Sequence, residues 1–109
     1  MVNGRNKGKR AELQLAHKLQ EWGFPARRSQ QFAGINGDAD VVGCPYLHIE
    51  CKAVERLNIH DAMNQSKRDA KEDEYPVVIH KKNRTPWLIT MELDDFEQFY
   101  KAYLEKWNE

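Results

Sequence analysis

The sequence has few cysteines, no long apolar run and no net charge, and each absence excludes a class of protein. Cys44 and Cys51 are too few for a disulfide framework and lack the spacing of a metal-binding motif. No apolar stretch approaches the roughly 20 residues of a membrane span, and the polar N-terminus lacks the hydrophobic segment of a secretory signal. We therefore expect residues 1–109 to form one domain in a reducing, cytoplasmic setting.

The zero net charge conceals an uneven distribution of charged residues. Residues 1–31 hold seven basic against two acidic side chains, whereas residues 92–109 hold six acidic against two basic ones. This asymmetry is compatible with one phosphate-binding side and one solvated side. It is equally compatible with charges that decorate an ordinary soluble surface, so charge alone leaves a nucleic-acid partner open.

Hydrophobic periodicity predicts helices and strands in the order α-β-β-β-α-β-β-α. In the first helix Leu15, Leu19 and Trp22 recur at helical spacing, and Gly23 ends the element. Helices are expected over residues 7–22, 58–71 and 94–106, and strands near residues 24–29, 41–42, 46–52, 77–80 and 86–90. This order predicts an α/β fold with a mixed central β-sheet flanked by helices.

The predicted strand over residues 46–52 carries a carboxylate and an ammonium group on one face. Because side chains alternate along a strand, Glu50 and Lys52 share that face with His48. The opposite face is apolar and consists of Leu47, Ile49 and Cys51. A Glu-x-Lys pair on a surface strand would be an ion pair of little energetic value. The motif by itself therefore identifies no site.

Two further acids change this interpretation. Asp40 directly precedes the short strand 41–42, and if that strand forms a hairpin with the next, Asp40 lies near Glu50 at one sheet edge. Converging carboxylates repel each other unless a cation lies between them, and hard oxygen ligands select Mg²⁺. Glu12 heads the apolar stripe of the first helix, where an acid either has a buried partner or interacts with the helix dipole. Together these acids predict a metal site.

In this order the motifs resemble the PD-(D/E)xK nuclease superfamily, most closely its archaeal-type Holliday-junction resolvase branch with its phage relatives. The resemblance rests on residues 8–12, on residues 27–29 before a glycine-rich loop at 32–38, on residues 39–42 and 49–52, and on Gln65 of the second helix. Ala39 stands where the family often has proline, which affects a turn and no ligand. The resemblance implies a restriction-endonuclease-like core.

It also implies hydrolysis of a DNA phosphodiester by water. Asp40 and Glu50 would hold Mg²⁺, with Mn²⁺ as a possible substitute, and the Cys51 carbonyl and Glu12 would be additional inner or outer ligands. Lys52 would orient the water or stabilise developing charge, and Gln65 would position the water. Candidate contacts to the DNA backbone are Lys9, Arg10, Arg27, Arg28 and Ser29.

The favoured function is a Mg²⁺-dependent endonuclease of branched DNA, acting in the host cytoplasm if the gene belongs to a phage. Alternatives are another superfamily nuclease of nickase, flap, repair or restriction type, a non-catalytic DNA-binding module, and a structural protein with a chance Glu-x-Lys strand. A homodimer is also expected, because a four-way junction is cut at two matching positions. The aromatic stripe of the last helix fits either core or a dimer interface: Phe96, Phe99, Tyr100, Tyr103 and Trp107.

Overall fold

The computed structural model describes residues 4–29 and 39–108, and its elements follow the predicted order. The glycine-rich loop at 32–38 lies outside the described residues. The elements are the helices α1 (Gly4–Glu21), α2 (Ile59–Asp69) and α3 (Leu93–Trp107), and the strands β1 (Arg27–Arg28), β2 (Val41–Val42), β3 (Leu47–Ala53), β4 (Tyr75–Lys81) and β5 (Leu88–Met91).

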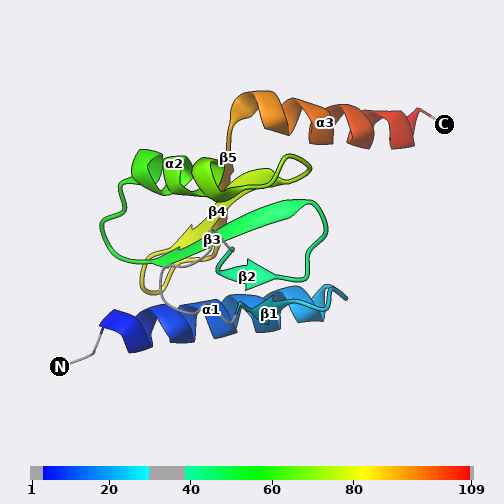
Figure 1. Ribbon diagram of the computed structural model, residues 1–109. Helices are drawn as coiled ribbons and strands as arrows, with labels where there is room; N and C mark the ends of the chain where they lie inside the picture. The colour runs from blue at the N-terminus through cyan, green and yellow to red at the C-terminus, as the bar shows by residue number, and fades with distance from the viewer. Residues whose placement is uncertain (1–3, 30–38, 109) are drawn as a thin grey trace.

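The described strands form one mixed sheet in the order β1-β2-β3-β4-β5, so the predicted architecture is confirmed. The pairs β1–β2, β2–β3 and β4–β5 are antiparallel, whereas β3 and β4 run parallel. Parallel neighbours need a long crossover connection, which α2 supplies between β3 and β4 (Figure 1). This crossover also places a helix over one face of the two central strands.

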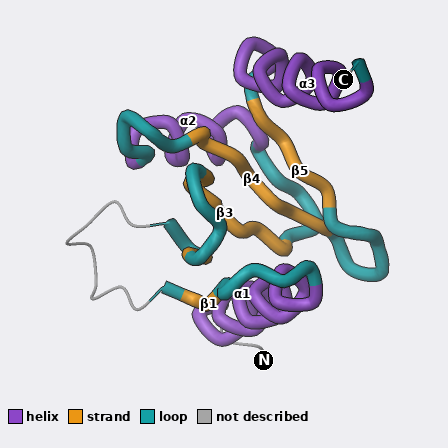
Figure 2. Tube along the Cα trace, turned by 90° about the vertical axis from the view of Figure 1, so that its right-hand side faces the viewer, coloured by secondary structure: helices purple, strands orange, loops and turns teal. Residues whose placement is uncertain are grey.

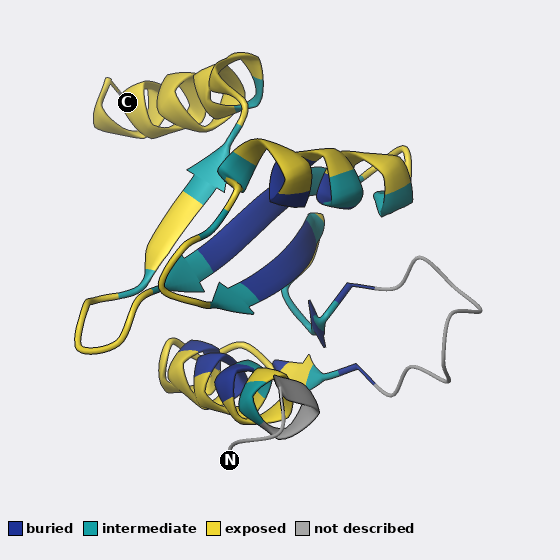
Figure 3. Ribbon diagram, turned by 90° about the vertical axis from the view of Figure 1, so that its left-hand side faces the viewer, coloured by how far each residue is buried: buried dark blue, intermediate teal, exposed yellow. Residues whose placement is uncertain are grey.

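The sheet lies between two helices, so β3 is buried on both faces (Figures 1 and 3). Leu15 and Leu19 of α1 belong to one core cluster with Ile49 of β3. On the other face, α2 packs against Val78 through Ala62 and Met63 in a second cluster. Because side chains alternate along β3, its polar members His48 and Glu50 are enclosed beneath α2 and do not face solvent.

The prediction for Trp22 was wrong, since its side chain is 65% exposed. Helix α1 ends at Glu21, and Gly23 adopts a φ of 96°, which turns the chain away from the helical path. The amide of Phe24 donates to the Leu19 carbonyl oxygen over 3.2 Å, as in a glycine-terminated helix end. Leu19 is therefore the last buried residue of the stripe, while the predicted stop at Gly23 is confirmed.

A second glycine, Gly43, brings two chain segments into close contact. Gly43 follows β2 with a φ of 103°, and its Cα faces the backbone that leads into β1. A Cβ at this position would lie 2.2 Å from the Pro25 carbonyl oxygen and 2.8 Å from the Ala26 Cα. The β2–β3 hairpin thus requires a residue without a side chain at position 43.

Helix α3 projects from the end of β5 beyond the α2 side of the sheet (Figures 1 and 2). Phe99 contacts Tyr75 of β4 with ring centroids 4.9 Å apart, but no residue of the helix is buried (Figure 3). The aromatic stripe of α3 is therefore not part of the core. Within residues 4–29 and 39–108, no helix has the length and apolar character needed to cross a membrane.

Candidate active site

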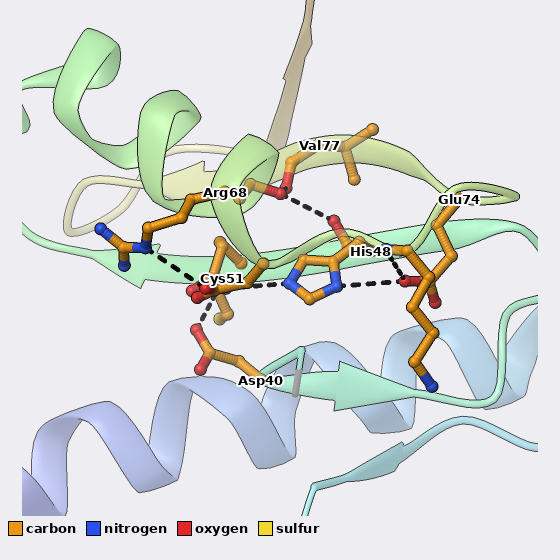
Figure 4. A network of polar contacts seen from close by, with 10 residues as sticks. Asp40, His48, Cys51, Arg68, Glu74 and Val77 are labelled. Atoms are coloured by element: carbon orange, nitrogen blue, oxygen red, sulfur yellow. Dashed lines mark hydrogen bonds and ion pairs between the residues drawn. The ribbon is translucent and has the colours of Figure 1, made fainter. Parts of the chain in front are cut away.

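The antiparallel pairing of β2 with β3 brings Asp40 to Glu50, as the hairpin argument predicts. Val41 pairs with Ile49, and the Asp40 amide donates to the Ile49 carbonyl oxygen over 2.9 Å. The Asp40 side chain then points at β3, where its Oδ2 atom accepts a 2.9 Å hydrogen bond from the Cys51 amide (Figure 4). The β2–β3 hairpin thus places two acids at one point on the sheet.

The charge state of Asp40 reflects this crowding. Burial and then the charge of Glu50 raise the pKa of Asp40 from 3.8 to about 7. The Cys51 amide opposes this change because its hydrogen bond favours the carboxylate, and the charge of Glu12 adds to the increase. At neutral pH, a nearby positive charge would therefore favour the ionised form of Asp40 strongly.

Glu50 is the most enclosed acid of the site, with 1% of its surface exposed. Its Oε1 atom lies 3.3 Å from Nε2 of His48, and Nδ1 of the same ring lies 3.4 Å from Oε1 of Glu74 (Figure 4). The Lys71 amide donates to that Glu74 oxygen over 2.9 Å. The other Glu50 oxygen, Oε2, is buried and has no hydrogen-bond partner among the described residues.

His48 links the two glutamates from inside the fold. Burial opposes a charged ring, but the hydrogen bonds and charges of Glu50 and Glu74 outweigh it and raise the pKa of His48. Ser66 of α2 donates to the His48 carbonyl oxygen over 3.0 Å and so restrains the backbone at this position. The buried ring thereby holds the Glu50 carboxylate in place.

This set of groups fits a hard divalent cation. It offers carboxylate oxygens from β3 and from the residue directly before β2, including the unpartnered Oε2 of Glu50, and such ligands suit Mg²⁺. Among the described residues no three His, Cys, Asp or Glu side chains converge into a complete metal cage. Mg²⁺ commonly uses one or two protein carboxylates and completes its shell with water and phosphate, so a partial cage is compatible with this ion.

Glu12 approaches the site from the α1 side of the sheet, opposite α2. Its Oε1 atom accepts a 2.7 Å hydrogen bond from Nε of Arg28 in an ion pair. Its charge contributes to the raised pKa of Asp40, which puts the two acids within electrostatic reach. Arg28, which was expected to contact DNA, thus forms an ion pair with Glu12. Glu12 affects the pKa of Asp40, but among the described residues it does not join Asp40 and Glu50 in a three-ligand metal site.

The other expected catalytic residues lie on β3 and on α2. Lys52 is half-buried on β3 and makes no ion pair among the described residues. Gln65 is half-buried on α2, next to Ser66. Burial raises the pKa of the Cys51 thiol to about 12, so this side chain is neutral core and only its carbonyl is a candidate ligand.

The residues expected to contact DNA differ in how exposed their side chains are. Lys9, Arg10 and Arg27 are exposed, as a contact to phosphate requires. Ser29 is buried, with 8% exposure, and its amide donates to the Asp40 carbonyl oxygen over 3.0 Å. In this arrangement Ser29 supports the Asp40 backbone and does not present its hydroxyl to solvent.

Sequence reasoning missed the contribution of Glu74. This residue lies after α2 and immediately before β4, and the parallel pairing of β3 with β4 brings it near His48. The Tyr75 amide donates to the Tyr46 carbonyl oxygen over 2.7 Å, which fixes the start of that pairing. No local motif indicates this contact, because it depends on the register of two strands separated by a helix.

The raised pKa of Asp40 predicts how pH affects stability without a divalent cation. Between about pH 4 and pH 7 the folded state keeps a proton that the unfolded chain has released, so stability falls as pH rises through this window. Above it the buried charge destabilises the fold by roughly 2–4 kcal/mol, since one pKa unit equals about 1.4 kcal/mol. Asp40→Asn removes this charge and should flatten the dependence in urea titrations with EDTA. Parallel profiles for the two proteins would contradict the assignment.

Comparison with known proteins agrees with the class of enzyme that this fold and acid pair define, the PD-(D/E)xK nucleases. The chain belongs to the family described as "Phage putative PDDEXK endonuclease", whose sequence profile matches residues 3–108. A solved structure of Hjc from Archaeoglobus fulgidus, a Holliday junction resolvase of an archaeal hyperthermophile, matches with a TM-score of 0.62 and 29% identity. The match covers 77% of this chain and 76% of that one. No curated protein matches the sequence. The expected superfamily and its restriction-endonuclease-like fold are confirmed.

Proposed function

We propose that this nuclease is a Mg²⁺-dependent DNA endonuclease that resolves branched DNA such as Holliday junctions. The observation that carries the proposal is the meeting of Asp40 and Glu50 from adjacent strands, with a buried Glu50 oxygen left without a partner. The likeness to Hjc supports the junction as substrate. In a cell infected by a phage, such DNA is found in the host cytoplasm.

Each site residue has a distinct role in this proposal. Asp40 and Glu50 hold the cation, the Cys51 carbonyl is a further ligand, and Glu12 acts from the α1 side as an outer group. Bound Mg²⁺, or Mn²⁺ in its place, supplies positive charge for the phosphate and lowers the pKa of a coordinated water. Lys52, which has no ion-pair partner among the described residues, directs its ammonium group at developing negative charge.

Residues around the acids assist without contacting the reacting atoms. Gln65 on α2 positions the attacking water, and His48 with Glu74 keeps the Glu50 carboxylate oriented. Lys9, Arg10 and Arg27 are exposed and bind backbone phosphates, which provides affinity without reading the base sequence. Arg28 acts through its ion pair with Glu12.

We also propose that two copies act together as a homodimer. Resolving a four-way junction requires cuts at matching positions in two strands, and each copy has one acid pair. The exposed aromatic face of α3 supports this assembly, because an isolated soluble domain seldom leaves so many large apolar side chains in water: Leu93, Phe96, Phe99, Tyr100, Tyr103, Leu104 and Trp107.

The decisive experiment offers one preparation four labelled DNAs, namely a four-way junction, a flap, a linear duplex and a single strand. With Mg²⁺, we expect paired nicks at symmetric positions on the junction, products with 5′-phosphates, and no cleavage in EDTA. Preferential cutting of the flap or the duplex would instead indicate another nuclease of the superfamily. Binding of every DNA without cleavage of any would indicate a non-catalytic module and end the proposal.

A further inference from the structure

A groove with an unusual concentration of positive charge lies between the N-terminal half of α1 and the turn that joins β4 to β5. Its volume is about 420 Å³, and its lining includes Lys7 and Arg10 from the helix and Lys81 and Arg84 from the β4 end and the turn. Among residues 4–29 and 39–108, no acidic residue lines it. In a chain with no net charge, four cations around one groove are a local excess that attracts an anion.

These cations are held apart from the acids of the fold. None of the four takes part in an ion pair among the described residues. The Lys81 ammonium lies over the Trp87 ring, 5.4 Å from its centroid, and this contact restrains the lysine while leaving its charge unneutralised. Glu55 contacts this turn by accepting a 2.9 Å hydrogen bond from the Asn83 amide, and Glu55 is not part of the groove lining.

Two residues that line the groove are next in sequence to candidate site residues. Ala11 and Ala53 form part of its lining, and they are the sequence neighbours of Glu12 and Lys52. Lys81 pairs with Ala53 in the parallel register of β3 and β4, which places it at the same end of the sheet as Lys52. A polyanion lying in the groove, on the α1 face of β3, would therefore reach the end of the sheet whose other face carries Lys52.

We propose that this groove holds the phosphate backbone of a duplex DNA arm next to the bond that is cut. The inference rests on the proposed nuclease function and adds a second contact region to it, formed by the β4–β5 turn. Lys and Arg side chains that make no ion pair among the described residues suit phosphate contacts, which hold the DNA in position and are independent of sequence. The geometry thus directs one DNA arm across Lys81 and Arg84.

The test compares two doubly substituted proteins that lose the same charge. The groove variant carries Lys81→Gln and Arg84→Asn, because asparagine tolerates the positive φ of 64° at position 84. The control carries Lys101→Gln and Lys106→Gln on α3, which lies on the other side of the sheet from α1 (Figure 1). Fluorescence anisotropy in EDTA measures the affinity of each protein for a labelled four-way junction and duplex across a salt series, and thermal melting checks that each is folded.

For the groove variant we expect the slope of log affinity against log salt to become shallower by about 1.8, since each lost phosphate contact contributes about 0.9. The weakening should be equal for unrelated DNA sequences, and Lys81→Arg should retain wild-type binding. A wild-type slope in the folded groove variant, or an equal change in the control, would overturn the groove as a DNA contact. Cleavage of junctions by the wild type would still uphold the nuclease function in that case. The wild type could instead bind DNA, lose that binding in the groove variant and cleave none of the DNAs. That result would refute the nuclease function and support the groove as a DNA contact.

Discussion

Glu50→Gln is expected to reduce junction cleavage at least about a thousandfold, the loss that corresponds to roughly 4 kcal/mol of transition-state stabilisation. The substitution keeps the shape of the side chain but removes the charge of the most buried acid of the site. Asp40→Asn should have an effect of the same order, because its carboxylate meets Glu50 from the adjacent strand. Single-turnover cleavage of a four-way junction with Mg²⁺ measures both effects.

Two controls separate lost chemistry from lost structure in this experiment. Glu105→Gln removes one negative charge from exposed α3 and should leave the cleavage rate unchanged. Binding of the junction in EDTA should be at least as strong in Glu50→Gln and Asp40→Asn as in the wild type, because a negative charge near the phosphates has been removed. Cleavage at the wild-type rate by either folded variant would exclude the mechanism.

Gly43→Ala is expected to destabilise the protein by about 3–5 kcal/mol, which is at the upper end for a single substitution. The new methyl group would meet the Pro25 carbonyl oxygen at 2.2 Å, a backbone atom that cannot move without displacing β1. The positive φ of 103° adds a conformational cost that any residue other than glycine bears. Urea unfolding with tryptophan fluorescence gives the free energy of unfolding.

Two other glycines serve as matched controls for Gly43. At Gly23, where φ is 96° and no atom of the described residues beyond its chain neighbours lies within 4 Å of an added Cβ, alanine should destabilise the fold by only about 1–2 kcal/mol. At Gly8 within α1, with open space and no positive φ, alanine should stabilise it by up to about 1 kcal/mol. Equal decreases in the free energy of unfolding for the alanine variants at positions 43 and 23 would show that the close contact with Pro25 does not affect stability.

The chemistry of the candidate site could be anticipated because its acids lie on strongly patterned elements. Asp40 directly precedes β2, whose Val41 pairs with Ile49, and a hairpin brings nearby strands together, so the meeting of Asp40 and Glu50 followed from local structure. The contact between Glu12 and Arg28 was harder to predict from the sequence. Their 2.7 Å ion pair joins a helix to a strand and depends on how α1 packs against the sheet.

By itself the sequence determined the order of the elements, the helix stop at Gly23 and the motif that identifies the superfamily, because these depend on local propensity and on residues close together in the chain. Tertiary structure alone decided which polar groups are buried. Packing of α2 over β3 enclosed His48 and Glu50, and the parallel register of β3 and β4 brought Glu74 to the histidine. The same register joined Lys81 and Arg84 to the α1 cations in one groove. These contacts link residues far apart in the chain, and their positions follow from the sheet and not from any local pattern.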